Sequence, residues 1–197
     1  SIERAMNQKP AFAWEPDKPT LVGVMPRSGT PDDIRWIEGD ACYVFHFANG
    51  SDVEGVITVE ACHFDSPPLF PMVDGTPTPA NVHPSLARWT IDMNASNPRV
   101  KMDYLADHGA EFPLIDPRSA MREYQHTWYT SSDRSIPAQI PDSDVVYNAI
   151  VRFDVKSHTA DSYAFDAGYV AEPMFVPRSA DAPEGVGWVL STVYDIP

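Results

Sequence analysis

Hydrophobic and polar residues alternate with a period of two in several separate stretches of the chain. The alternating stretches are Ala41–Ala48, Val53–Phe64, Leu86–Met93, Val145–Val155, Ser162–Val170 and Gly187–Tyr194. Successive side chains of a β-strand point to opposite faces of a sheet, so this period predicts half-buried strands. No stretch shows a convincing helical period of 3.6 residues.

Proline-rich and polar segments separate these stretches. Ser66–Pro84 contains six prolines and is expected to be a long surface loop, and Ser131–Ser143 is a second polar connection. Residues 116–125 are expected to form a short helix, with Asp116 as its cap and Pro117 at its first position. Short strands joined by frequent turns are typical of a sandwich, barrel or propeller. The pattern alone therefore predicts an all-β domain.

The stretch Ala41–Ala48 carries a histidine among aromatic residues and runs directly into Asn49-Gly50. The alternation predicts that Phe45 and His46 point to opposite faces of this strand. An Asn-Gly pair between strand-like segments predicts a hairpin turn.

Composition and charge limit the classes of function. The chain has 197 residues, enough for one domain with a hydrophobic core, and 43% of them are hydrophobic. Its formal net charge of −14 would repel nucleic acid and anionic membrane surfaces, so no nucleic-acid partner is expected. Cys42 and Cys62 are the only cysteines, which excludes a disulfide framework and favours a cytoplasmic location.

The sequence has six histidines, and no two of them have close metal-ligand spacing. They are His46, His63, His83, His108, His126 and His158. Isolated histidines are mostly surface or hydrogen-bonded core residues, and this is expected of His83 and His158, which lie in polar loop segments. His63 and His126 adjoin aromatic strand segments, where they would be placed to line a cavity. There is no glycine-rich phosphate loop and no nucleophile elbow.

Short motifs in a fixed order carry the strongest functional signal. They are Gly23-Val24-Met25-Pro26-Arg27, Ile34-Arg35-Trp36, Phe45-His46-Phe47-Ala48-Asn49, Glu111-Phe112-Pro113-Leu114-Ile115-Asp116 and Glu172-Pro173-Met174-Phe175-Val176. In this order and spacing they resemble segments of the carotenoid and stilbene cleavage oxygenases, the retinal-pigment-epithelium-protein-like family. The resemblance covers nearly the whole chain, which corresponds to less than half of such a protein.

The resemblance implies a fold and a metal site. The family's fold is a seven-bladed β-propeller, of which residues 1–197 would supply, as a single fragment, about three consecutive blades of antiparallel strands. The family binds iron(II) through four histidine imidazoles, and the Phe-His-x-x-Asn motif identifies His46 as one of them. The two glutamate motifs imply that Glu111 and Glu172 are hydrogen-bond partners of ligand histidines, and we expect Glu111 to pair with His46. The other three ligands are expected outside this chain.

By this resemblance, the parent protein would be a non-haem iron(II) dioxygenase that cleaves an alkene double bond of a carotenoid, apocarotenoid or stilbene-type substrate with O₂. A single imidazole binds iron(II) too weakly to compete with water, so we expect the fragment alone to be inactive. No catalytic residue is predicted in it. Its partners would be the apolar alkene, O₂, and the remainder of the parent chain or a second copy at the exposed sheet edges. Two alternatives remain: a retinoid-isomerase-like member of the same family, and a metal-free β-domain that binds a partner or sugar through Ser66–Pro84.

Overall fold

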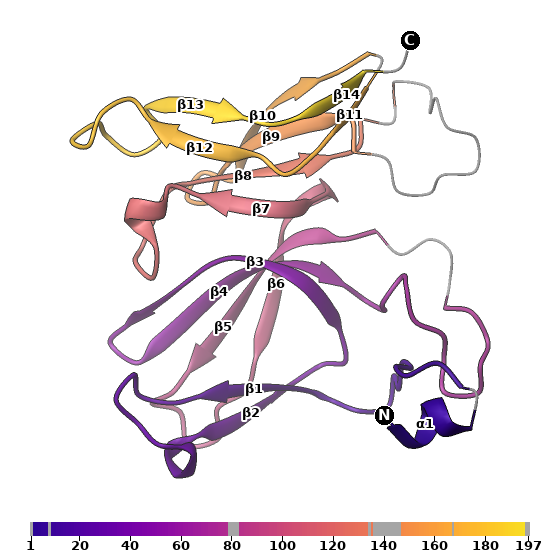
Figure 1. Cartoon of the computed structure of the whole chain (residues 1–197). Coiled ribbons are helices and arrows are strands. Elements are labelled where there is room, and N and C mark those ends of the chain that lie inside the picture. Colours follow the sequence, from indigo (N-terminus) through magenta and orange to yellow (C-terminus); the bar gives the residue numbers. More distant parts are fainter. Residues whose placement is uncertain are drawn as a thin grey trace.

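Antiparallel sheets make up nearly all the regular structure of the chain (Figure 1). The computed structural model describes residues 2–7, 9–78, 83–133, 135, 147–166 and 168–195. The described residues contain fourteen strands, one short α-helix (α1, Ile2–Met6) and two 3₁₀ helices. The all-β fold class is therefore confirmed. Within the described residues no helix is both long and apolar enough to cross a bilayer.

Two four-stranded sheets form the centre of the molecule, and in each the strands follow one another in chain order. The first contains β3 (Tyr43–Val53), β4 (Val56–Phe64), β5 (Ser85–Asp92) and β6 (Lys101–Gly109). The second contains β7 (Glu111–Ile115), β8 (His126–Ser131), β9 (Ala149–Asp154) and β10 (Thr159–Ala164). This antiparallel meander is the blade arrangement of a β-propeller. The two blades meet along β3 and β7, which lie side by side (Figure 1).

A long, interrupted hairpin follows the second sheet. Its first arm is β11 (Gly168–Val170) and β12 (Met174–Pro177), and its second arm is β13 (Gly187–Leu190) and β14 (Val193–Asp195). The pairing is continuous across the break, because the Ala171 amide donates to the Thr192 carbonyl at 2.9 Å. The stretches expected at Ser162–Val170 and Gly187–Tyr194 are thus each divided between two strands. A separate pair, β1 (Thr20–Val24) and β2 (Arg35–Gly39), precedes the first blade. The described chain therefore has two complete four-stranded blades and two partial ones, where about three blades were expected.

The turn predicted at Asn49-Gly50 is wrong. Both residues lie inside β3, paired with Glu60 and Val59. The hairpin instead turns at Glu54-Gly55, where the two φ angles are 51° and 81°, the left-handed pair that a two-residue turn requires. Asn49 does not form a turn because its side chain is buried and bonded to another part of the chain, as described below.

The main core lies between the two blades. Its buried side chains come from both sheets and the segments beside them: Cys62, Leu86, Leu105, Ala110, Ile115, Tyr124, Tyr129, Val151, Phe153 and Val155. A partly buried ion pair, Glu60 with Arg88 at 2.7 Å, joins β4 to β5. The helix expected at residues 116–125 is only a 3₁₀ turn, Pro117–Ser119, capped as predicted by the Asp116 carboxylate.

Large apolar side chains are exposed at both ends of the arc of sheets. Trp36 on β2 is 63% exposed, and Trp188 on β13 is 53% exposed. Leu21, Leu190 and Tyr194 are also exposed on the same terminal strand pairs. Contiguous exposed apolar surface is a common feature of protein–protein contact sites.

Candidate metal and substrate site

His46 and Glu111 meet at the junction of the two blades. His46 lies on β3 and Glu111 begins β7. The His46 Nδ1 atom is 2.6 Å from the Glu111 Oε2 atom, and the Phe112 amide donates to the same oxygen at 2.7 Å. The hydrogen bond expected between this histidine and this glutamate is therefore present.

Backbone irregularities aim both side chains at the same place. The β3–β4 register shifts between Val44 and Phe47 and again between Phe47 and Asn49. The β7–β8 register shifts just after Glu111, where Phe112 has a left-handed φ of 52°. Bulges of this kind redirect side chains and are common beside active sites.

The bulges also overturn one expectation from the alternation. Phe45 and His46, predicted on opposite faces, line the same cavity, with their ring centroids 6.4 Å apart. The alternation rule assumes a regular pleat, and an inserted residue breaks it.

The environment of Glu111 decides how His46 presents its ring. Burial raises the pKa of the Glu111 carboxyl, and the Phe112 amide and His46 oppose that shift. When the carboxylate is ionised it accepts the Nδ1–H of a neutral imidazole, so the proton resides on Nδ1 and the Nε2 lone pair is left available. The His46 side chain is 42% exposed, whereas Glu111 is buried. This is the arrangement of a metal-binding imidazole fixed by a carboxylate.

Glu172 lies in the break between β11 and β12 and is exposed. Its charge acts on Glu111 and contributes to raising the pKa of that carboxyl. No described residue forms a hydrogen bond or ion pair with its side chain. Its role as the partner of a ligand histidine remains a prediction.

A cavity of about 740 Å³ opens beside His46. Its apolar wall consists of Phe45, Phe64, Pro68, Leu69, Pro84, Phe112 and Tyr147. Phe112 links the wall to the histidine, since its ring centroid is 4.8 Å from that of His46 and 5.7 Å from that of Tyr147. A flat, apolar molecule would fit this aromatic lining.

Two histidines that the sequence did not single out also line the cavity. His83 was expected to be an ordinary loop residue, but it lies on the cavity wall. His108 lies there too, with its Nε2 atom 2.7 Å from the Tyr129 hydroxyl. Nothing local in the sequence indicates either position, and the packing of β6 against β8 brings His108 beside Tyr129.

The two histidines that adjoin aromatic strand segments do not line this cavity. His63 is buried, beside Asp65 and Tyr104, and lines a smaller pocket of about 160 Å³. His126 is also buried, and its Nε2 atom lies 3.0 Å from Arg152. Burial lowers the pKa of both imidazoles. Both are therefore core histidines.

The described residues of the site can supply one ligand to a metal ion, but not a complete set of ligands. Among the described residues no group of three or more His, Cys, Asp or Glu side chains is arranged to hold a metal. His46, with Nδ1 engaged and Nε2 available, has the chemistry of a single imidazole ligand. Any further ligands would have to come from outside the described residues.

Several known proteins with similar sequences and structures are named as oxygenases. A sequence model described as retinal pigment epithelial membrane protein matches residues 1–196. Isoeugenol monooxygenase of Pseudomonas putida is 34% identical over 98% of this chain and 41% of its own length. The crystal structure of Pseudomonas brassicacearum lignostilbene dioxygenase matches with a TM-score of 0.90 and 31% identity, over 99% of this chain and 45% of that chain.

A metal-containing structure is also similar. Cobalt-substituted Synechocystis apocarotenoid oxygenase matches with a TM-score of 0.75 and 28% identity, over 92% of this chain and 37% of that chain. The chain spans less than half the length of each of these relatives.

Proposed function

Because the chain belongs to the retinal pigment epithelial membrane protein family, we propose that it forms part of an iron(II) oxygenase that uses O₂ to cleave the double bond of an alkene. The observation that carries the proposal is the pairing of His46 with Glu111 at the mouth of an aromatic cavity. A carboxylate that fixes the imidazole tautomer is what a metal ligand needs, and a buried carboxylate is costly without such a use.

The cavity supports an apolar, planar substrate. Its wall beside His46 is formed by aromatic rings, and its volume of about 740 Å³ is in the range of small-molecule sites. The relatives named above act on isoeugenol, lignostilbenes and apocarotenoids. A phenylpropanoid or stilbene-type alkene is the substrate class we propose for this chain, with carotenoid-derived alkenes next.

The residues of this chain would help to bind the iron and to orient the substrate. His46 would hold one position of the iron, Glu111 would keep the His46 proton on Nδ1, and Phe112 would pack the substrate beside the imidazole. Bound iron(II) would supply the redox chemistry that O₂ needs to react with an alkene. The apolar wall would exclude water from the reacting double bond.

The remaining ligands and the rest of the cavity would come from sequence beyond this chain. We propose that further blades pack against the exposed apolar ends of the arc and close a seven-bladed ring. On its own, the chain offers a single imidazole and would not catalyse the reaction.

Substitution of His46 by asparagine in the intact protein tests the proposal. The wild-type protein, loaded with iron(II) and supplied with isoeugenol, a 4-hydroxystilbene or an apocarotenal, should give carbonyl products that incorporate ¹⁸O from ¹⁸O₂, identified by mass spectrometry. His46→Asn should abolish them. His158→Asn is the matched control, because His158 is exposed and has a left-handed φ of 57° that asparagine tolerates. Full turnover by His46→Asn, or none by the wild type with any of the three alkenes, would contradict the proposal.

A further inference from the structure

Asn49 uses its whole side-chain amide to hold a loop of the neighbouring blade. It is buried on β3, three residues after His46. Its Nδ2 atom donates to the Ser119 carbonyl at 3.2 Å and to the Arg122 carbonyl at 3.0 Å. Its Oδ1 atom accepts the Met121 amide at 2.9 Å. The Asn49 side chain therefore makes three hydrogen bonds, all with the backbone of residues 119–122.

The loop that Asn49 holds directly follows β7, the strand that begins with Glu111. Met121 near the end of the loop has a left-handed φ of 62° although it is not a glycine, and its side chain is exposed. This conformation costs free energy that an unrestrained loop would avoid. The exposed Met121 side chain offers no packing that offsets that cost, so the three hydrogen bonds from Asn49 help to hold Met121 in this conformation.

Two separate contacts therefore join the same pair of elements. One is the hydrogen bond from His46 to Glu111, and the other is the amide of Asn49 on the loop after β7. The cavity-lining residues, as far as the structure describes them, do not include Asn49, so it is not placed to touch a substrate.

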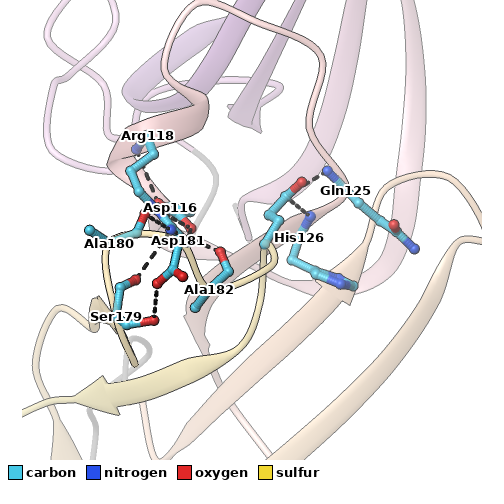
Figure 2. Close-up of polar contacts among 9 residues, drawn as sticks. Asp116, Arg118, Gln125, His126, Ser179, Ala180, Asp181 and Ala182 are labelled. Carbon is cyan, nitrogen blue, oxygen red and sulfur yellow. Dashed lines mark hydrogen bonds and ion pairs between the residues drawn. The ribbon is translucent and has the colours of Figure 1, made fainter.

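The same loop is also bonded to the turn of the interrupted hairpin, as Figure 2 shows. Arg118 donates to the carbonyls of Ser179, Ala180 and Ala182 at 3.4, 2.9 and 2.9 Å. These residues lie in the turn between β12 and β13. Arg118 is itself held by Asp116, whose buried carboxylate accepts from its guanidinium. The loop at residues 116–122 thus contacts β3, which carries His46, follows β7, which carries Glu111, and is bonded to the turn between β12 and β13.

We propose that Asn49 is a positioning residue, which sets the spacing of β3 and β7 and thereby orients the His46 ring through Glu111. The inference rests on the proposed function, since it concerns the proposed metal ligand His46. Its test reads the orientation of the imidazole directly, and so does not depend on turnover of any alkene.

The test uses the intact protein labelled with ¹⁵N-histidine. In the wild type, the short hydrogen bond should give the His46 Nδ1–H a downfield proton resonance, assigned by its loss in His46→Asn. Asn49→Asp keeps the shape of the side chain but cannot donate to the two carbonyls. It should broaden or remove the resonance and weaken Co²⁺ binding roughly tenfold, the usual cost of disturbing an outer-shell partner. In the iron enzyme, kcat should fall with little change in KM.

Two further variants separate positioning from a general loss of stability. Ser51→Ala is the control, since Ser51 lies on the same strand and its hydroxyl bonds within the sheet to Thr58 at 2.9 Å. It should leave the resonance and Co²⁺ binding unchanged. Adding Met121→Gly to Asn49→Asp should restore part of both, because glycine adopts a positive φ without help.

Two results would overturn the positioning role of Asn49. A folded Asn49→Asp protein that keeps the wild-type resonance and Co²⁺ affinity overturns it. If Asn49→Asp does not fold, hydrogen exchange in the wild type decides: the Met121 amide and the His46 Nδ1–H should show the same opening free energy over a denaturant series. Independent exchange of the two protons would overturn the inference.

Discussion

At the scale of single residues, the motifs predicted the His46–Glu111 pair but not its surroundings. The pair could be predicted because a ligand imidazole needs an acceptor on Nδ1 and the family motif supplies one. The positions of His83 and His108 on the cavity wall could not be predicted, because they depend on how a long loop and a neighbouring strand pack. The metal role of His46 and the role of Glu172 remain predictions.

Two substitutions of Glu111 distinguish the effect of its negative charge from the effect of its shape. Glu111→Gln keeps an oxygen that can accept from His46 and Phe112, but it removes the negative charge that makes the imidazole a stronger ligand. We expect Co²⁺ affinity in the intact protein to fall about tenfold in Glu111→Gln and further, up to about a hundredfold, in Glu111→Ala. Isothermal titration measures both. Glu123→Gln, at an exposed position, is the control. Wild-type affinity in Glu111→Ala would show that Glu111 does not support a ligand.

At the scale of elements, periodicity predicted where strands occur but not how they end or bend. The alternation from Ala149 to Val155 is regular in the structure, with Arg152 exposed between the buried Val151 and Phe153. Val145, where that stretch was expected to begin, lies outside the described residues. The turn predicted at Asn49-Gly50 was wrong because the side chain of Asn49 forms hydrogen bonds with the loop after β7 in the next blade. Local turn preferences do not record such a long-range contact.

Glycine substitutions test this corrected turn. Gly55 has a φ of 81°, and a Cβ atom there would lie 2.7 Å from the Asn94 amide nitrogen. Gly55→Ala should therefore reduce the free energy of unfolding by about 1–3 kcal/mol. Gly50 lies in regular strand backbone and a Cβ atom would come no closer than 3.3 Å to its neighbours, so Gly50→Ala should cost less than about 1 kcal/mol. Urea denaturation of the two variants measures the difference, and the reverse order would place the turn at Asn49-Gly50.

At the scale of the whole molecule, the exposed apolar side chains lie at the two ends of the arc of sheets. The sheets form an arc whose two ends carry exposed apolar side chains, and the sequence predicted such edges because a propeller blade buries both faces against its neighbours. How many complete sheets the chain contains could not be predicted from periodicity. The expected stretch Ser162–Val170 divides between β10 and β11, Gly187–Tyr194 divides between β13 and β14, and β12 lies in neither stretch. The number of strands in a blade is set by pairing, which a local pattern does not record.

Substitution of Trp188, at one end of the arc, should have different effects in the isolated chain and in the intact protein. In the isolated chain its side chain is 53% exposed, so Trp188→Lys should reduce self-association, seen by sedimentation velocity, and leave the fold unchanged. In the intact protein we expect another blade to cover it. There Trp188→Lys should lower the free energy of unfolding by at least about 2 kcal/mol, because it removes apolar burial and introduces a buried charge. Tyr163→Lys is the control, since Tyr163 is 67% exposed on the outer strand β10 and should be neutral in both contexts. Equal melting temperatures for the intact wild type and Trp188→Lys would mean that this face stays open, and that the arc does not continue past β13.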